Sequence, residues 1–406
     1  MKLKADIAVV GGGPAGSSTA FTAAKLGLNV LLIDRKAHLG VPVQCGEAIG
    51  KTGPSLAEID IPQAAIRNPI RGFRIYSPSN LTVDYAKPQP DGYIVDRRVF
   101  DKELFIKAAE AGAEALINTD IKELTYKDGK VTGLIGLNDN GKVEVEAKII
   151  VGADGVFSII AKLSGLRKYS KLSDLDASVG YEMCNVEYDD PELMEFYMGK
   201  NIAPRGYVWI FPKGDKRANV GIGVGAEYSE RTALEYMRSF MKEHPIGKEK
   251  LKNAKIVEYR VGAIPLGGPN DKNIIDNLML VGDAAGQVHP ITGGGIGYSL
   301  VCGSIAGRVA AEAIEAGDTS ERMLSNYEKR WRDKYGEEFD KMLKLRTLLE
   351  KVEDKTLDQL AEIFNGQNII DLTAGRKISI LFSAVKKRNR ELLNLLNSFR
   401  NLKLIQ

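Results

Sequence analysis

The first 34 residues alternate between short apolar runs and one helical pattern. Asp6 to Val10 has the composition of a buried strand, and Asn29 to Asp34 has it again. Between them, small residues with helical spacing follow a glycine-rich turn and stop at Gly27, which is typical of a helix end. The pattern therefore predicts a strand, a helix and a second buried strand within about 30 residues.

Alternation of apolar and polar residues predicts hairpins in the next part of the chain. Gly72 to Tyr85 alternates on both sides of the turn sequence SPSN, and a helix is predicted from about Arg97 to Ala111. Turns at Asp128-Gly129 and Asn140-Gly141 then separate a series of short strands. These strands are predicted near Ala115, Leu124, Leu134 and Val143.

The second half of the chain changes from strands to helices. Lys148 to Val151 is another apolar run, and strands dominate from about Ser178 to Tyr259, with one helix near Glu230 to Lys242. A further apolar run, NLMLVGD, ends at Asp283, and the chain after Gly293 is mostly helical.

Apolar runs that lead into glycine-acid turns lie on both sides of the strand-rich stretch, so we predict an α/β fold of two interleaved units. A Rossmann-like unit takes residues 1–175 and 262–315, with inserted strands at 70–90. A β-sheet unit takes residues 176–261. Residues 316–406 form a helical C-terminal region.

Composition narrows the class of protein. A net charge of +3 over 406 residues gives no basis for nucleic-acid binding, so we predict no nucleic-acid partner. Three cysteines without CxxC spacing and three histidines argue against a disulfide framework and a metal site, and are typical of a reducing compartment. Neither a signal pattern nor an apolar run of about 18 residues is present, so we expect a cytoplasmic protein.

The glycine-rich turn after the first strand fits the pattern GxGxxG through Gly11, Gly13 and Gly16. The first glycine permits a tight turn, the second lets a pyrophosphate approach the backbone, and the third lets helix and strand pack closely. Asp34, at the end of the second strand, is placed to bind a ribose hydroxyl. The turn predicts a dinucleotide site, and by itself it does not separate FAD from NAD.

Two more carboxylates follow predicted buried strands. Asp154 stands in VGADG and Asp283 follows Gly282 in LMLVGDAAG. Open α/β sheets bind ligands at the carboxyl ends of their strands, so both patches are predicted to face the same ligand as the first turn. A chain that bound only NAD would not need all three.

The three patches, in this order, resemble the FAD-binding fold shared with p-hydroxybenzoate hydroxylase. Within that superfamily the segments PVQCGEAIG, YIVDRRVFD, GYVWIFPKG and DAAGQVHPITGGGIGYSL resemble the geranylgeranyl reductase family, in particular the archaeal enzymes that saturate geranylgeranyl chains of membrane lipids. The likeness covers about three-quarters of the chain, up to about Ala316. It makes the first unit an FAD-binding domain and the second a substrate-binding domain.

The resemblance implies a set of FAD contacts. Arg97 and Arg98 both stand where the family has one arginine, so this choice stays open, and Gln44 replaces the family's arginine before the cysteine. The N–H groups of Gly294, Gly295 and Ile296 would face the flavin, although these glycines also suit close helix packing. The other implied contacts, together with the turn residues, are Gly11, Gly13, Ala15, Gly16, Asp34, Cys45, Gly46, Ala48, Ile121, Asp154, Gly282 and Asp283.

Cys45 is the candidate catalytic residue. Reduction of an isolated C=C bond by hydride also needs a proton at the other carbon, and a positioned acid supplies it. Cys45 stands in a loop fixed by Pro42 and Gly46, with Glu47 placed to tune or recharge it. The alternative is that Cys45 is a small apolar residue packed on the flavin.

Tyr207, Trp209 and Phe211 alternate along one predicted strand and so share a face. Ordinary sheet packing explains such an alternation, and the family likeness adds a second interpretation, the apolar wall of a polyprenyl channel.

The sequence therefore predicts an FAD-dependent reductase of geranylgeranyl C=C bonds in archaeal-type ether lipids or their precursors. Two alternatives remain: a flavin monooxygenase or quinone-linked dehydrogenase of the same fold, and a prenyl-lipid carrier without catalysis. No second complete GxGxxG turn is present, so an external donor (NAD(P)H, ferredoxin or a deazaflavin) is expected.

The last 31 residues, Arg376 to Gln406, hold eight Lys or Arg and one Glu. Their apolar residues have helical spacing, which suits peripheral contact with an anionic membrane or packing on the protein itself.

Overall fold

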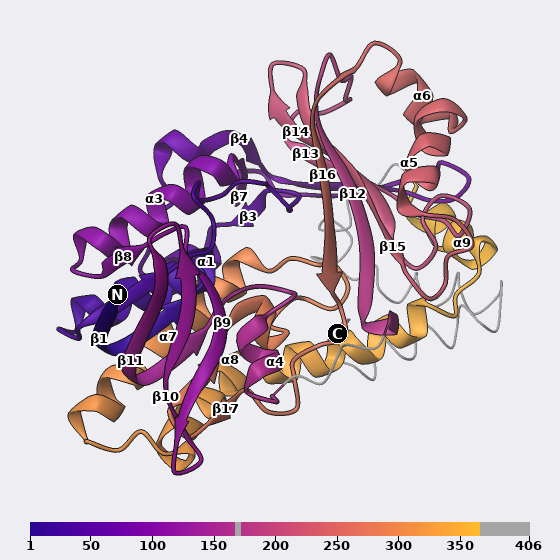
Figure 1. Cartoon of the computed structure of the whole chain (residues 1–406). Coiled ribbons are helices and arrows are strands. Elements are labelled where there is room, and N and C mark those ends of the chain that lie inside the picture. The colour runs from indigo at the N-terminus through magenta and orange to yellow at the C-terminus, as the bar shows by residue number, and fades with distance from the viewer. Residues whose placement is uncertain (167–171, 366–406) are drawn as a thin grey trace.

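The structure is a computed structural model that describes residues 1–166 and 172–365. The chain forms two units side by side, each with one large sheet and helices packed against it (Figure 1). The predicted basic helix within residues 376–406 lies outside the described residues.

The first sheet is mainly parallel, in the order β17-β18-β11-β1-β2-β8, with β10 and β9 added beside β11 as antiparallel strands. The first predicted strand-helix-strand unit is confirmed, because β1 and β2 pair in parallel from Ile7 and Val30 onward. The strands are β1 (Lys2–Val10), β2 (Val30–Ile33), β8 (Glu114–Leu116), β9 (Asp120–Lys127), β10 (Lys130–Asn138), β11 (Gly141–Gly152), β17 (Ile274–Ile275) and β18 (Leu278–Leu280).

The two predicted turns of this sheet differ in outcome. Asp128 and Gly129, with φ of 51° and 77°, connect β9 to β10 as predicted. The next turn is shifted by one residue: Asn138 pairs with Gly141, so Asp139 and Asn140 form it. Gly141, with φ of 99°, takes the left-handed position at the start of β11.

Helices cover one face of the first sheet. α1 and α7 cross closely, because a Cβ on Gly303 would lie 2.4 Å from the Ala15 carbonyl oxygen and one on Gly307 would lie 2.7 Å from that of Thr19. The small residues in the middle of α7 therefore allow the two helices to pack closely. The helices of this unit are α1 (Pro14–Lys25), α2 (Thr52–Ala57), α3 (Arg97–Glu110), α4 (Ile159–Leu163), α7 (Ile296–Glu315) and α8 (Glu321–Leu349).

The second sheet has seven strands in the order β16-β12-β15-β14-β13-β5-β6. The predicted hairpin at 72–85 is confirmed, but its place is not: strand β5 pairs in parallel with β13, so residues 72–86 belong to this second sheet and not to the first unit, where the sequence predicts inserted strands at 70–90. The strands are β5 (Gly72–Tyr76), β6 (Thr82–Ala86), β12 (Leu175–Cys184), β13 (Leu193–Tyr197), β14 (Tyr207–Gly214), β15 (Arg217–Gly225) and β16 (Lys255–Pro265).

Two helices, α5 (Ala233–Lys242) and α6 (Pro245–Leu251), cover the outer face of the second sheet. Thr232 and Glu235 form a capping box that starts α5 three residues after the predicted start. Between the large sheets lies a small sheet of β3 (Ala48–Gly50), β4 (Ile66–Ile70) and β7 (Gly92–Val95).

The helix α8 joins the two units (Figure 1). Glu321 at its start pairs with Lys272 beside the first sheet, and Arg346 near its end donates to the carbonyls of Ser173 and Leu266. The helix α9 (Asp354–Phe364) then docks on the β5–β6 hairpin, where Asp358 accepts from Ser77. None of the helices in the described residues is both long and apolar enough to cross a membrane. The predicted α/β fold class is confirmed.

Candidate functional site

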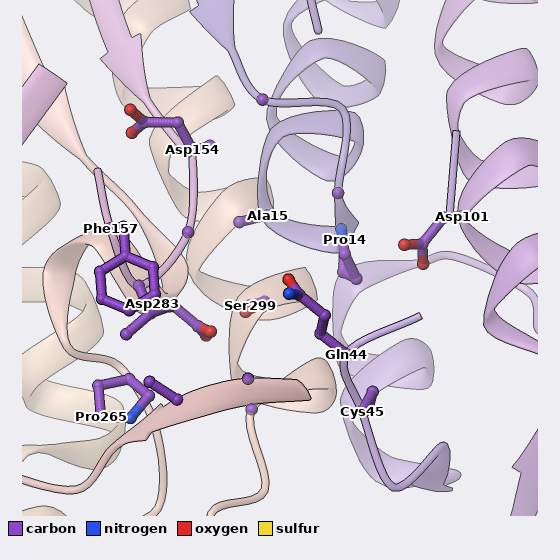
Figure 2. Close-up of a pocket in the computed structure, with 18 of the residues that line it drawn as sticks. Pro14, Ala15, Gln44, Cys45, Asp101, Asp154, Phe157, Pro265, Asp283 and Ser299 are labelled. Carbon is purple, nitrogen blue, oxygen red and sulfur yellow. The ribbon is translucent and has the colours of Figure 1, made fainter. Parts of the chain in front are cut away.

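A cavity of about 620 Å³ lies where the two large sheets meet (Figure 2). The turn after β1, the N-terminus of α7 and the cysteine loop surround it, and the inner face of the second sheet completes it. The predicted site residues that line this cavity are Gly11, Gly13, Ala15, Asp34, Cys45, Gly46, Arg97, Ile121, Asp154, Trp209, Asp283, Gly295 and Ile296. The predicted residues that do not line it are Gly16, Glu47, Ala48, Arg98, Tyr207, Phe211, Gly282 and Gly294.

The three glycines of the first turn have three different surroundings. A Cβ on Gly11, which has φ of 106°, would lie 2.3 Å from the Ala153 oxygen, and one on Gly16 would lie 1.8 Å from the Gly11 oxygen. A Cβ on Gly13 would meet nothing within 4 Å. Two glycines are therefore required by packing, whereas the third leaves open space over the N-terminus of α1.

Asp34 is buried at the end of β2 and holds the turn. Its carboxylate accepts the N–H of Gly12 at 2.7 Å and that of Lys36 at 2.7 Å. Each carboxylate oxygen keeps a further lone pair, so the group can still accept a hydrogen bond from a ligand hydroxyl in the cavity.

The two later acidic residues have different roles in the fold. The Asp154 carboxylate caps α4, accepting from Ser158 Oγ at 2.5 Å and from the N–H groups of Ile159 and Ile160 at 2.7 and 3.1 Å. Burial raises its pKa. In Figure 2 this carboxylate points away from Ala15, so the geometry favours a structural role for the side chain. Asp283 lines the cavity beside Gly295, whose Cβ would lie 3.3 Å from Asp283 Oδ1.

The helix α7 begins at the cavity without a side-chain cap. Gly295 is its N-cap residue and makes no side-chain hydrogen bond, so the first turn directs its N–H groups and its partial positive charge toward the cavity. His289 holds the preceding loop: its N–H donates to the Gly294 oxygen, and its Nδ1 accepts from the N–H groups of Ile291 and Thr292. Burial lowers its pKa, so this histidine is neutral and structural.

The structure distinguishes the two arginines, Arg97 and Arg98, between which the sequence could not choose. Arg97 lines the cavity and binds Asp101 with two hydrogen bonds of 2.7 and 2.8 Å. Burial opposes its charge, but Asp101 and the Cys45 side chain outweigh burial and raise its pKa. Arg98 instead points to Asp96 and Glu258, away from the cavity. Of these two arginines, Arg97 is thus the one within reach of a cavity ligand.

The cysteine loop is attached to the second sheet. Cys45 is half-buried at the cavity, its Sγ accepts the N–H of Glu47 at 3.2 Å, and its carbonyl oxygen accepts from Asn219 Nδ2 at 2.9 Å. A Cβ on Gly46 would lie 2.9 Å from the Phe211 ring, so the loop and strand β14 are in direct contact.

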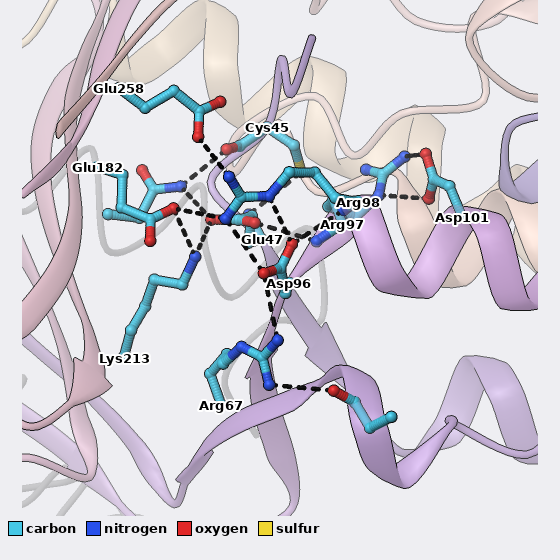
Figure 3. Close-up of polar contacts among 12 residues, drawn as sticks. Cys45, Glu47, Arg67, Asp96, Arg97, Arg98, Asp101, Glu182, Lys213 and Glu258 are labelled. Carbon is cyan, nitrogen blue, oxygen red and sulfur yellow. Dashed lines mark hydrogen bonds and ion pairs between the residues drawn. The ribbon is translucent and has the colours of Figure 1, made fainter. Parts of the chain in front are cut away.

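Glu47 lies behind the loop and has no exposed surface. Its carboxylate accepts from Lys213 Nζ at 2.9 Å, Arg260 Nη1 at 2.7 Å, Asn219 Nδ2 at 3.0 Å and the Arg97 N–H at 3.0 Å (Figure 3). Burial alone would raise its pKa, but Lys213 and Arg260 outweigh burial and hold the pKa below its usual value. A carboxylate kept ionised in this way is a poor proton donor, which argues against the predicted catalytic role of Glu47.

The polar cluster around Glu47 contains residues that our sequence reasoning missed. Lys213 and Arg260 also bind Glu182, at 3.0 and 2.7 Å. One signal was present: Lys213 continues the alternation of Tyr207, Trp209 and Phe211 onto the same face. A charge in phase with an apolar face needs a buried partner, and that partner is Glu47.

The aromatic residues of β14 share a face, as predicted, and pack in one cluster with Phe196 and Ile94. Trp209 reaches the cavity and lies over Gly221, where a Cβ would come within 2.3 Å of the indole. Tyr207 lies beside it and donates to the Thr292 carbonyl at 2.5 Å. The strand thus supports both the cysteine loop and the loop before α7.

Comparisons with known proteins agree with this arrangement. A family model described as FAD dependent oxidoreductase matches residues 6–164, and one described as geranylgeranyl reductase catalytic domain matches residues 174–264. The two matches fall on the two sheets that enclose the cavity.

Curated relatives come from methanogenic archaea. The chain is 43% identical over 359 residues to the digeranylgeranylglycerophospholipid reductase of Methanocaldococcus jannaschii, which covers 88% of this chain and 90% of the relative. It is 42% identical over 381 residues to digeranylgeranylglycerophospholipid reductase 2 of Methanothermobacter thermautotrophicus, covering 93% and 96%.

Solved structures extend the comparison to the fold. A geranylgeranyl bacteriochlorophyll reductase-like protein from Thermoplasma acidophilum superimposes with a TM-score of 0.89 at 33% identity, over 99% of this chain and 100% of that one. A flavin-dependent brominase, with a TM-score of 0.72 at 20% identity and coverage of 95% and 100%, shares the fold alone. The resemblance inferred from the sequence is confirmed: the chain belongs to the geranylgeranyl reductase family of FAD-dependent oxidoreductases.

Proposed function

We propose that this protein reduces C=C bonds in the geranylgeranyl chains of archaeal-type ether lipids or their precursors, with FAD as its cofactor. One observation carries the proposal: a single cavity is lined by the dinucleotide turn, the α7 N-terminus, Cys45 and Trp209. We call the side of the cavity formed by Trp209 on β14 the Trp209 wall. The names of the curated relatives, both digeranylgeranylglycerophospholipid reductases, support the choice of lipid.

The residues present fit FAD. The open space at Gly13 admits a pyrophosphate, and the uncapped N-termini of α1 and α7 supply two concentrations of partial positive charge. We assign Ala15 and Arg97 to the phosphates and Asp34 to the adenosine ribose. Ile121 and Asp283 both line the cavity, and we assign the Ile121 backbone to the adenine and Asp283 to the ribityl hydroxyls.

Reduced FAD, when bound, supplies the hydride that a C=C bond needs. The chain must supply a proton for the second carbon, and we assign this proton to Cys45 Sγ, the thiol at the cavity surface. The partly buried guanidinium of Arg97 lies at the same cavity and interacts with the Cys45 side chain. Trp209, packed against Phe196, supplies apolar surface to the cavity and helps exclude water from the reacting bond.

Turnover of the reduced protein with geranylgeranylated lipid tests the proposal. The dithionite-reduced holoprotein is expected to add about 2 Da to the lipid for each C=C bond reduced, as hydride plus proton. The reaction is run without oxygen, and mass spectrometry of the extracted lipid measures the added mass. Flavin that stays reduced beside unchanged lipid would contradict the reductase, and a protein that binds the lipid but no flavin would be a carrier.

Cys45→Ser is expected to keep FAD and to slow alkene reduction by about 100-fold, because a serine hydroxyl is a much weaker acid at a position of the same size. Single-turnover oxidation of the bound flavin by lipid, followed in a stopped-flow spectrometer, measures the rate. Cys184→Ser, at a half-buried cysteine on β12, is the matched control and should match wild type. An unchanged rate in Cys45→Ser would leave Cys45 as a packing residue.

We infer that the electrons come from an external donor such as NAD(P)H, a ferredoxin or a deazaflavin, because the chain has one complete GxGxxG turn and FAD occupies it in our assignment. We also infer peripheral contact with the cytoplasmic face of the membrane, since the lipid substrate resides there and the chain's last 31 residues are basic.

A further inference from the structure

Asn219, on β15, lies at the centre of the contacts between the second sheet and the cysteine loop. It has no exposed surface. Its Oδ1 accepts from Trp209 Nε1 at 2.9 Å, and its Nδ2 donates to the Cys45 carbonyl at 2.9 Å and to Glu47 Oε2 at 3.0 Å. One side chain therefore connects the cavity wall, the cysteine and the buried carboxylate.

Only an amide satisfies this set of partners. The indole N–H of Trp209 needs an acceptor, whereas the Cys45 carbonyl and the Glu47 carboxylate need donors. An asparagine presents one acceptor oxygen and two N–H donors, and here it uses all of them. Leucine has a similar size but would leave three buried polar groups without this partner.

The charges around Asn219 keep its partners in place. Glu47 has φ of 70°, a conformation that a non-glycine residue rarely adopts, and its surroundings must enforce it. Lys213 and Arg260 hold its carboxylate from the second sheet, and the first N–H of α3 holds it from the other unit (Figure 3). The loop is thus tied to both units through one carboxylate.

Close packing on both sides of Asn219 makes the position of the loop sensitive to it. Trp209 lies flat against Gly221, and Phe211 lies against Gly46. Asn219 makes two of the hydrogen bonds between the loop and the second sheet. The others include Gln44 Nε2 to the Val261 carbonyl at 2.9 Å and Arg260 Nη1 to the Cys45 carbonyl at 3.5 Å. Loss of the Asn219 bonds leaves the Trp209 indole N–H without its partner and leaves the Cys45 carbonyl with the longer 3.5 Å contact to Arg260.

We infer that Asn219 is a positioning residue that fixes the Cys45 loop against the Trp209 wall, so that the thiol meets the double bond held on that wall. The inference rests on the proposed function for its chemistry. Its structural part, the coupling of Trp209 to Cys45 through one amide, holds whatever the substrate is.

The test uses FAD-saturated protein with Cys184→Ser in the background, so that Cys45 is the one half-buried thiol, Cys302 being buried. In Asn219→Leu, the alkylation of Cys45 by iodoacetamide is expected to quicken by about 5-fold or more, because the loop opens more often. The indole N–H signal of Trp209 in a ¹⁵N spectrum is expected to shift. Trp209→Phe identifies that signal, since the chain has two tryptophans.

With geranylgeranylated lipid, kcat is expected to fall by about 10-fold or more while KM changes by less than about 3-fold, as for a misplaced reacting group. Asn273→Leu is the matched control: this asparagine is equally buried, beside β17, and its alkylation rate and kcat should equal those of wild type. Asn219→Ser, which adds no bulk, gives the same readouts if the leucine variant does not fold.

An alkylation rate within about 2-fold of wild type, with an unshifted Trp209 signal, would overturn the coupling. Altered labelling with an unchanged kcat would overturn the catalytic part. The alkylation rate and the Trp209 signal need no lipid, so they test the coupling separately from the proposed function. A wild-type protein that reduces no lipid contradicts only the proposed function.

Discussion

Replacement of Gly13 by valine is expected to weaken FAD binding strongly while the chain still folds. Gly13 has φ of −76° and ψ of −173°, an extended conformation that valine adopts readily, and its Cβ would meet nothing within 4 Å. The added methyl groups would stand where we place the pyrophosphate. We expect FAD affinity to fall by about 100-fold or more, equal to about 2.7 kcal/mol. Flavin titration of the apoprotein measures it, and the apoprotein should unfold at the wild-type temperature.

Gly16→Val is the contrasting variant within the same turn. Its Cβ would lie 1.8 Å from the Gly11 oxygen, so helix α1 would have to move away from β1, and the apoprotein itself should be destabilised. If Gly13→Val still carries one FAD per chain, the pyrophosphate does not pass over this turn, and our assignment of the phosphates to α1 is wrong.

The parts of the fold that were predicted correctly are those that depend on local sequence patterns. The strand-turn-helix at residues 6–27 depends on contacts between neighbours in sequence, and so does the Asp128-Gly129 turn. The hairpin at 72–86 shows the limit of such patterns. Its two strands were predictable from alternation, but its place beside β13 was not, because β13 begins more than 100 residues later.

The choice between Arg97 and Arg98 could not be made from the sequence. Both stand in the first turn of α3, and they project about 100° apart around its axis. Which one meets the cavity depends on how α3 packs against the sheet. In the structure Asp101, one turn later, binds Arg97 and directs it to the cavity.

The cluster around Glu47 was missed for a similar reason. Its members stand on a loop and on β12, β14, β15 and β16, and each looks like an ordinary charged residue in its own segment. The sequence placed Glu47 beside Cys45 and so suggested proton transfer between them. Nothing in the sequence indicates that Glu47 is buried between Lys213 and Arg260. Their charges keep its carboxylate ionised, so Glu47 is a fixed anion and not an acid.

Glu47→Gln is expected to lower the free energy of unfolding by about 3 kcal/mol at pH 7, because it removes a buried carboxylate from two buried cations while keeping its size. Glu182 remains as a partner of both cations, which keeps the loss at the lower end of the range for a broken buried pair. Urea unfolding of wild type and variant, both saturated with FAD, measures the difference.

The pH dependence of this difference has a definite sign. The pKa of Glu47 in the folded protein lies below its usual value of 4.5, so the unfolded chain takes up this proton first as the pH falls. The stabilisation by the carboxylate is therefore complete above about pH 4.5 and is lost as the pH falls through the folded pKa. Wild type and Glu47→Gln should differ most near pH 7 and converge in acid.

Glu187→Gln is the matched control, because Glu187 pairs with Lys216 on the surface, where both side chains are more than half exposed. Its loss should change the free energy of unfolding by less than about 0.5 kcal/mol at pH 7. If Glu47→Gln is as stable as this control at every pH, Glu182 alone satisfies the buried cations. The cysteine loop would then be held by Asn219 and packing, and the left-handed conformation of Glu47 would have no electrostatic cause.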